Sequence, residues 1–410
     1  MARIIPIVTE QAASKFASST TGLAGAGSLL TALPPLSVYI HVPWCVRKCP
    51  YCDFNSHQAP SVLPEDQYLD ALEGDLEQAL PSIWGRQVHT VFIGGGTPSL
   101  LSAHAMDRLL SMLRTHLNLW PDAEITIEAN PGTAEAHRLL EYARSGVNRI
   151  SLGIQSFDNR QLSALGRVHD ADQARAAIEM AQRAVARVNL DLMFALPQQT
   201  LEEAIRDARE ALSFGTEHLS MYQLSIEPNT VFAKFPPALP EDDLAVEMED
   251  AIEGLCGAAG LERYEVSAFA KAGARARHNL NYWQFGDYLG LGPGAHGKLS
   301  FPDKILRQAR TRSPDTWMQS ALQRDGSHIA ESRTLDPSEL PFEFMLNALR
   351  LREGVPASLY SERCGMAPAG FAGMLAQAAQ KGLLIDSSVR YQATPIGWRF
   401  LNELQGIFLS

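Results

Sequence analysis

Three cysteines lie close together near the start of the chain and could bind a metal. They occur in the segment CVRKCPYC at residues 45–52, which gives the spacing C-x3-C-x2-C. Thiolates are soft ligands that suit iron–sulfur clusters and zinc. Three cysteine ligands leave one iron of a four-iron cluster without a protein ligand, and an open position of this kind is useful only where an exchangeable molecule binds. Cys45, Cys49 and Cys52 are therefore candidate ligands of a metal centre with one open coordination site.

Zinc is the alternative that these residue types allow. A structural zinc site normally has four protein ligands, and His41 and His57 flank the loop and could supply the fourth. The loop, however, resembles the cluster-binding loop of the radical S-adenosylmethionine (SAM) superfamily in its cysteine spacing, in Tyr51 before the last cysteine and in its position after a predicted strand. The resemblance implies a [4Fe-4S] cluster whose open iron is chelated by the amino and carboxylate groups of SAM. It also implies that an electron passed through the cluster cleaves SAM to a 5′-deoxyadenosyl radical.

The remaining cysteines do not suggest a disulfide framework. The chain has five cysteines, and Cys256 and Cys364 stand alone. Clustered cysteines in a chain without an export signal indicate metal or redox chemistry. We expect Cys256 and Cys364 to be small buried apolar residues.

Composition and charge exclude several classes of protein. The chain has 410 residues, is 46% hydrophobic and carries a formal net charge of -11, which argues against a general nucleic-acid binder. It has no run of 18 apolar residues that could span a membrane. Residues 1–36 are rich in Ala, Ser, Thr and Gly and lack the features of a secretory signal, so we interpret them as a flexible N-terminal extension. We expect a cytoplasmic protein without a membrane anchor.

The cysteine loop follows the first of several alternating strands and helices. Such alternation indicates right-handed βαβ units and a parallel sheet. The predicted strands are Ser37–Val42, His89–Ile93, Glu124–Ala129, Asn148–Gln155, Val188–Phe194 and His218–Leu224. The predicted helices are Asp66–Leu80, Ala105–Leu117, Thr133–Ser145, Ala171–Arg183 and Leu201–Phe214. The fold class is therefore α/β, a partial (β/α)6 radical SAM barrel assigned to residues 37–300.

The pattern changes in residues 301–410. Helices are predicted over Phe342–Leu351, Gly370–Leu384 and Thr394–Leu404, with a short hairpin at Leu384–Ala393. Helices followed by a hairpin resemble a winged-helix module, which often binds DNA. Residues 331–410 carry seven Lys/Arg against eight Asp/Glu, and this balance lacks the positive charge that DNA binding requires. We therefore predict a C-terminal helical, winged-helix-like accessory domain.

Polar residues and glycines follow or end the predicted strands, where α/β folds place their sites. The segment GGGTPS at 94–99 follows the second strand, and successive glycines let the backbone approach a ligand closely. It resembles the GGE-type turn that contacts the SAM amino group in the radical SAM superfamily, with Thr97 in place of the acidic residue. Glu128, Gln155, Arg167 and Asp191 could meet at one mouth of the barrel, although each alone is as well explained by a helix cap or an ion pair.

Several segments together resemble a narrower family, the oxygen-independent coproporphyrinogen III dehydrogenases. They are YIHVPWC at 39–45, GGGTPS at 94–99 and LGRVH at 165–169. This resemblance implies that the SAM-contacting positions are Tyr39, Gly95, Gly96, Thr97, Glu128, Gln155, Arg167 and Asp191.

The family has two branches, and the sequence favours the one formed by the heme chaperone HemW. The dehydrogenases carry a further cysteine where this chain has Phe54, and residues 1–36 do not resemble their substrate-covering arm. The segment RHNLNYW at 277–283 instead resembles the H-N-x-x-Y-W motif of the chaperone branch. The resemblance implies heme binding and heme delivery to acceptors such as respiratory-chain proteins. His278 is then the candidate heme ligand, with His296 a weaker one, and neighbouring aromatic residues could pack on the macrocycle. Coproporphyrinogen III decarboxylation stays open as the alternative, because every SAM-contacting residue is present.

Overall fold

A single curved sheet forms the centre of the molecule. The computed structural model describes residues 30–132 and 138–409. Six neighbouring strands run parallel to one another: β1 (Leu36–Val42), β4 (Gln87–Gly95), β5 (Asn118–Ala129), β6 (Arg149–Gln155), β7 (Arg187–Phe194) and β8 (His218–Gln223). All six predicted strands are confirmed, and they form the partial (β/α)6 barrel expected from the alternation.

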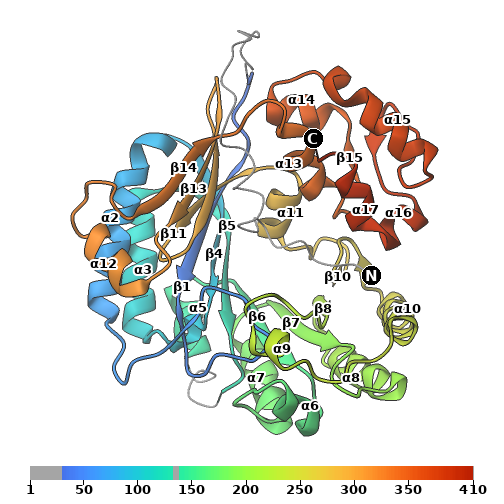
Figure 1. Cartoon of the computed structure of the whole chain (residues 1–410). Helices are drawn as coiled ribbons and strands as arrows, with labels where there is room; N and C mark the ends of the chain where they lie inside the picture. The colour runs from blue at the N-terminus through green and yellow to red at the C-terminus, as the bar shows by residue number, and fades with distance from the viewer. Residues whose placement is uncertain (1–29, 133–137, 410) are drawn as a thin grey trace.

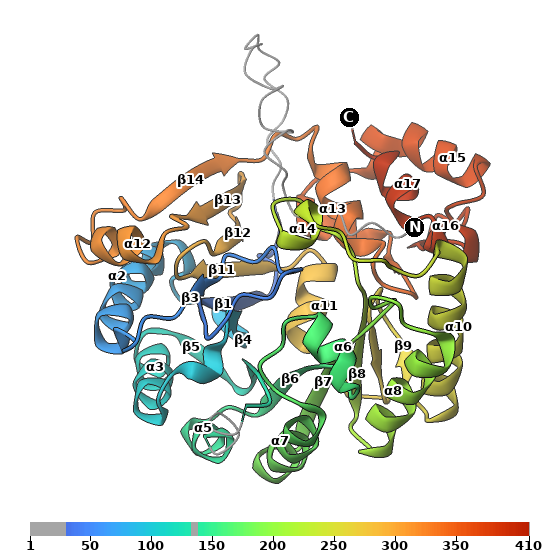
Figure 2. The ribbon, with the colours of Figure 1, turned by 60° about the horizontal axis from the view of Figure 1, so that its bottom comes forward.

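Helices cover the convex side of this sheet (Figures 1 and 2). They are α2 (Glu65–Ile83), α3 (Ala103–His116), α5 (Leu139–Ser145), α7 (Ala171–Ala184), α8 (Leu201–Ser213) and α10 (Asp242–Ala258). Capping boxes at Asp170 and Thr200 begin α7 and α8 by satisfying backbone N–H groups that the first turn leaves unpaired. Of the helix predicted from residue 133 to 145, the part at 133–137 lies outside the described residues, and α5 begins at Leu139.

The sheet continues beyond the six parallel strands on both sides. On the β1 side follow β11 (Asp287–Leu291), which is parallel to β1, and then the antiparallel β12 (His296–Ser300), β13 (Ile305–Arg310) and β14 (Ile329–Thr334). On the β8 side follow β10 (Ala268–Ala270) and β9 (Glu262–Arg263). The two edges, β14 and β9, do not meet, so the barrel is open. These strands were not predicted from the sequence. The sheet extends to Thr334, beyond residue 300, and the domain boundary at residue 300 stays a prediction.

A helical region follows the sheet and has its own core. It contains α13 (Leu340–Ala348), α14 (Ser358–Cys364), α15 (Ala372–Gln380), α16 (Pro395–Arg399) and α17 (Leu401–Gly406). Phe344, Tyr360 and Phe371 pack together at its centre. The predicted hairpin is reduced to one antiparallel bridge between Leu384 and Ala393, because β16 (Arg390–Tyr391) pairs instead with β15 (Val355–Pro356).

Short elements complete the fold. They are β2 (Trp44–Cys45), β3 (His57–Gln58), α6 (Asn159–Ala164), α9 (Val231–Lys234), α11 (Arg277–Trp283) and α12 (Pro314–Ala321). Cys256 and Cys364 are fully buried, as predicted. Most of the predicted N-terminal extension, residues 1–29, lies outside the described residues. Within residues 30–132 and 138–409, no helix is both long enough and apolar enough to cross a membrane.

Candidate functional site

The cysteine loop begins directly after β1 and is closed at its base by the pairing of β2 with β3. The backbone N–H of Cys52 donates to the carbonyl of Cys49 over 3.2 Å. Each of the three sulfurs lies near a polar side chain from the protein: Cys45 near Thr97, Cys49 near Arg167, and Cys52 near Ser56. Burial raises the pKa of the Cys45 and Cys52 thiols, so metal binding there would displace protons.

His41 lies behind the loop with both ring nitrogens engaged. Its Nε2 donates to the carbonyl of Asn55 over 2.9 Å, and its Nδ1 accepts from the Tyr39 hydroxyl over 3.0 Å. Burial lowers the pKa of His41 to about 4, which agrees with a neutral ring of this tautomer. A nitrogen that is already hydrogen-bonded in this way is not free to bind zinc, so the arrangement removes His41 as the fourth zinc ligand considered above.

The glycine-rich turn after β4 packs directly against the cysteine loop. A Cβ at Gly95 would lie 2.6 Å from the His41 ring, and one at Gly96 would lie 2.6 Å from the carbonyl oxygen of Trp44. Gly95 also has φ +111°, which residues with side chains rarely adopt. The N–H groups of Gly96 and Thr97 donate to the carbonyls of Val42 and Trp44 over 2.7 Å each. These glycines are therefore needed for the close contact between the turn and the cysteine loop.

Thr97, Asn130 and Arg167 connect two of the cysteines. The Thr97 hydroxyl donates to Cys45 Sγ over 3.4 Å and accepts from Asn130 Nδ2 over 2.9 Å. Arg167 Nη2 donates to Asn130 Oδ1 over 2.5 Å, and its Nη1 donates to Cys49 Sγ over 3.5 Å. Arg167 Nε is buried and has no partner among the described residues, so it could bind an acceptor on a ligand. The sequence analysis did not select Asn130, although an Asn–Pro pair at a strand end is a recognisable turn signal.

Two carboxylates face one another across the strands next to this turn. Glu128 accepts from the Gly95 N–H over 3.0 Å, and burial together with the negative charge of Asp191 raises the pKa of Glu128 to about 8. Asp191 accepts from Ser151 over 2.7 Å and from Asn189 over 2.8 Å, and burial raises its pKa. Neither Glu128 nor Asp191 has a positively charged side chain hydrogen-bonded to it among the described residues. Such a buried carboxylate favours a cationic or hydrogen-bond-donating ligand.

Most of the predicted SAM residues lie at or just beyond the carboxyl ends of the strands, whereas Tyr39 and Asp191 lie in the middle of β1 and β7. Gln155 is the last residue of β6 and has φ 67°. Its side-chain amide and the guanidinium group of Arg167 both lie next to Gly153. Tyr39 is joined to the loop through His41, and its pKa is raised by burial and by Glu128. The structure thus brings the glycine-rich turn, Glu128 and Arg167 next to the cysteine loop. Tyr39 and Asp191 lie deeper in the barrel, and the assignment of all eight residues to SAM stays a prediction.

His278 lies elsewhere, toward the amino-terminal halves of the strands. Helix α11 contacts β1, β4 and β11 of the sheet and α13 of the C-terminal region (Figures 1 and 2). The buried Glu124 carboxylate accepts from the backbone N–H groups of Arg277 and His278 and so fixes the start of this helix. His296, the weaker candidate, is exposed at the start of β12.

The His278 ring is buried and has one free nitrogen. Thr90 Oγ1 donates to Ser37 Oγ over 2.8 Å and therefore accepts from His278 Nδ1–H over 2.7 Å. Burial lowers the pKa of His278 to about 3, so the ring is neutral. Its Nε2 then carries a lone pair and has no partner among the described residues. Phe92 and Tyr282 flank the ring at 5.0 and 4.9 Å between centroids.

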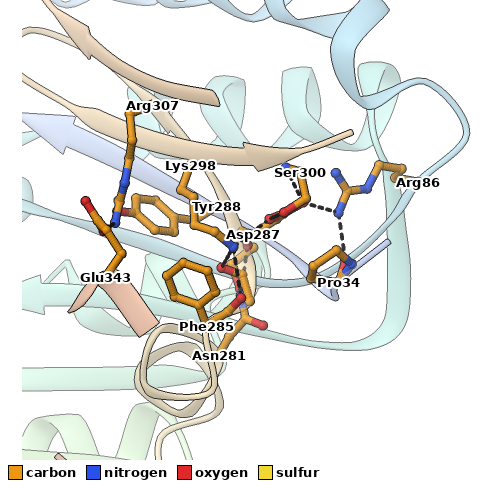
Figure 3. A network of polar contacts seen from close by, with 12 residues as sticks. Pro34, Arg86, Asn281, Phe285, Asp287, Tyr288, Lys298, Ser300, Arg307 and Glu343 are labelled. Atoms are coloured by element: carbon orange, nitrogen blue, oxygen red, sulfur yellow. Dashed lines mark hydrogen bonds and ion pairs between the residues drawn. The ribbon is translucent and has the colours of Figure 1, made fainter. Parts of the chain in front are cut away.

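A buried ion-pair network holds the end of α11 against the sheet (Figure 3). Lys298 Nζ donates to the carbonyl of Phe285 over 2.9 Å and to Asp287 Oδ1 over 3.0 Å. Asp287 also accepts from Arg86 over 2.8 Å and from both the N–H and the hydroxyl of Ser300. Because Phe285 and Asp287 follow α11 closely in the chain, this network holds the segment after the helix against β12.

Comparisons with known proteins show which families and folds this chain is similar to. The Radical SAM superfamily profile matches residues 39–211, and the HemN C-terminal domain profile matches residues 335–400. The protein named Heme chaperone HemW from Escherichia coli (strain K12) is 48% identical over 380 residues, which cover 92% of this chain and 99% of that protein. The protein of the same name from Bacillus subtilis (strain 168) is 34% identical over 381 residues, covering 91% and 99%. The solved structure of coproporphyrinogen III oxidase (HemN) from Escherichia coli has a TM-score of 0.78 at 23% identity, covering 92% of this chain and 90% of that one.

Proposed function

The chain belongs to the heme chaperone HemW family of the radical SAM superfamily, and on this basis we propose that it binds heme and transfers it to acceptor proteins. Membership of the superfamily implies a [4Fe-4S] cluster and SAM. We further propose a cytoplasmic location and acceptors that include respiratory-chain proteins.

The residues after β1 fit an iron–sulfur cluster. Cys45, Cys49 and Cys52 would hold it, and the glycine-rich turn leaves no side chain between the loop and the sheet. The guanidinium of Arg167, 3.5 Å from Cys49 Sγ, would stabilise the negative charge of thiolate ligands. When bound, the cluster supplies electron transfer to SAM, and the work of this chain is to position the two and limit access of water.

The surrounding polar side chains fit SAM. Glu128 and the backbone of Gly95 and Gly96 would accept from and orient its amino group, and Arg167 Nε would bind its carboxylate. We assign Tyr39, Thr97, Gln155 and Asp191 to the remainder of the same site. Thr97 contacts Cys45, Gln155 lies beside Arg167, and Tyr39 and Asp191 lie close enough to Glu128 for their charges to interact.

The free Nε2 of His278 is the observation that carries the heme assignment. A neutral imidazole whose Nδ1–H is fixed by a hydrogen bond is the form that binds heme iron. The ring is 1% exposed, so iron binding requires Phe92 or Tyr282 to move aside. We therefore expect heme binding to be slower than diffusion and dependent on how firmly α11 is held.

Heme titration tests this proposal. The wild-type protein should produce a Soret band, and His278→Ala should weaken and shift it, while His296→Ala serves as the matched histidine control on the exposed start of β12. An identical Soret band in His278→Ala would remove His278 as the ligand, and no band in the wild-type protein would refute heme binding.

Incubation with coproporphyrinogen III separates the chaperone from the dehydrogenase. Phe54 stands exposed where the dehydrogenases have an additional cysteine, and we expect no decarboxylated product. Catalytic formation of protoporphyrinogen from reconstituted protein, SAM and a reductant would show that the chain is a dehydrogenase.

Cysteine substitution tests the cluster ligands separately. After anaerobic reconstitution, Cys49→Ala should lose most of the bound iron, because one ligand of three is removed. Cys256→Ala, which changes a buried cysteine far from the loop in the sequence, should keep it. Full iron content in Cys49→Ala would overturn the ligand assignment.

A further inference from the structure

Arg350 follows α13 and lies against α11, the helix that carries the candidate heme ligand His278. The centre of its guanidinium group lies 4.3 Å from the centroid of the Trp283 ring, and its side chain is 19% exposed. Arg350 Nε and Trp283 Nε1 are both buried without a hydrogen-bond partner among the described residues. A buried guanidinium with an unused N–H is unusual because each unpaired polar group costs free energy.

The charge of Arg350 is poorly compensated. Its ion pair in the described part of the chain, with Glu265, is long at 3.7 Å. Glu265 already accepts from the Ser267 N–H, and burial raises its pKa, which weakens it further as a counter-ion. Burial also lowers the pKa of Arg350. Arg307 on β13 differs, because Glu343 of α13 and the Tyr288 hydroxyl both pair with it.

The position of Arg350 is nevertheless fixed by its surroundings. Its guanidinium carbon lies over the Trp283 ring, and this cation–π contact limits the movement of the group. A backbone bridge joins Glu265 to Leu351, and the N–H of Arg352 donates to the carbonyl of Tyr264 over 3.0 Å. A guanidinium group that is held in place and has only a long ion pair is suited to bind a planar anion with two oxygens, such as a carboxylate.

We propose that Arg350 binds a carboxylate of the heme, namely one of the propionate groups of the porphyrin. This inference rests on the proposed heme-binding function. The short helix α11 contains both His278, the candidate iron ligand, and Trp283, whose ring contacts Arg350. One helix would therefore position the iron ligand and the arginine that binds the propionate. The edge of the guanidinium group that Glu265 does not occupy would donate to the propionate oxygens, while Trp283 covers one face.

Comparison of heme with its dimethyl ester tests the proposal, because the ester has the same iron and macrocycle but no carboxylates. Both ligands are titrated into the full-length protein in the same mild detergent. Arg350→Gln should raise the dissociation constant for heme by about 10- to 100-fold, the effect of one charged hydrogen bond, and leave that for the ester unchanged. Arg350→Lys should restore part of the heme affinity because it keeps the charge and loses the planar group.

Arg352→Gln is the matched control. The guanidinium carbon of Arg352 also lies over a tryptophan ring, that of Trp398 at 5.0 Å, and Arg352 pairs with Glu253. These two partners belong to α16 and α10, not to α11. This variant should bind both ligands as the wild-type protein does. Equal weakening of heme and ester in Arg350→Gln would mean that Arg350 only supports the fold, and no weakening of either would also refute the proposal. Absence of binding of both ligands by the wild-type protein would instead refute the proposed function.

Discussion

Replacement of Lys298 by methionine would test whether the network behind α11 holds the fold together. Lys298 is 1% exposed and donates to two backbone carbonyls, Phe285 at 2.9 Å and Gly286 at 3.3 Å, and to Asp287 (Figure 3). Its Nζ also lies 4.0 Å from the centroid of the Phe285 ring. Methionine fills a similar volume without a charge, so Lys298→Met removes the donor and changes the packing little.

The expected cost follows from what the substitution leaves behind. Removal of one partner from a buried ion pair typically lowers the free energy of unfolding by about 3–5 kcal/mol, because the other charge stays buried. Asp287 would still accept from Arg86 over 2.8 Å and from the N–H of Ser300 over 2.9 Å. This remaining compensation places the expected loss near the lower end, at about 3 kcal/mol.

Urea denaturation of the apoprotein, followed by circular dichroism and by tryptophan fluorescence, measures this loss. Lys304→Met is the matched control, because Lys304 is exposed and its Nζ lies 5.5 Å from the ring centroid of Phe301. The control should stay within about 0.5 kcal/mol of the wild-type protein. If the two variants unfold at the same urea concentration with the same slope, the network does not stabilise the fold and the reasoning is wrong.

Three other outcomes follow from the same structure. Gly95→Ala should lower the free energy of unfolding by about 1–3 kcal/mol, because φ +111° and the His41 ring exclude a side chain. Gly85 has φ +73° and open space around it, so Gly85→Ala should lower the free energy of unfolding by less. Urea denaturation measures both changes. Burial raises the pKa of Glu128 from 4.5 to about 8, so the stability linked to its protonation is present below pH 4.5 and is lost as pH rises through 8. The advantage of Glu128→Gln over the wild-type protein in urea denaturation should therefore grow between about pH 4.5 and pH 8 and stay constant above that, and a difference that does not change with pH would contradict this. Asn130→Leu breaks the connection between Thr97 of the turn and Arg167, and should weaken SAM binding about 10-fold in equilibrium dialysis while iron content is retained.

The site at the mouth of the barrel could be predicted from sequence because its parts are local. Cys45, Cys49 and Cys52 lie in one loop, and the turn at 94–99 directly follows a strand. Parallel strands bring their carboxyl ends to one edge, so residues at those ends must meet once the strands are recognised. Asn130 was missed because an asparagine before proline indicates a turn and gives no information about its contacts.

The strands after β10 were harder to predict. β11 lies beside β1 and parallel to it, although more than two hundred residues separate them in the chain. Its segment, Asp287–Leu291, is short and fully buried, so it lacks the alternation that identifies a half-exposed strand. The hairpin expected at Leu384–Ala393 is mostly replaced by pairing of β16 with β15, because cross-strand contacts between distant segments override a local tendency.

The sequence by itself determined the parallel sheet, the cysteine loop and the family resemblance, because each depends on residue types at short, regular spacings. The tertiary structure alone decided which nitrogen of His278 is free, that Lys298 is buried with Asp287, and that Arg350 stacks on Trp283. These features arise where the C-terminal helices pack against the inner side of the sheet. The burial and pairing of a charged side chain there depend on neighbours distant in sequence, and the spacing of residues along the chain carries no information about them.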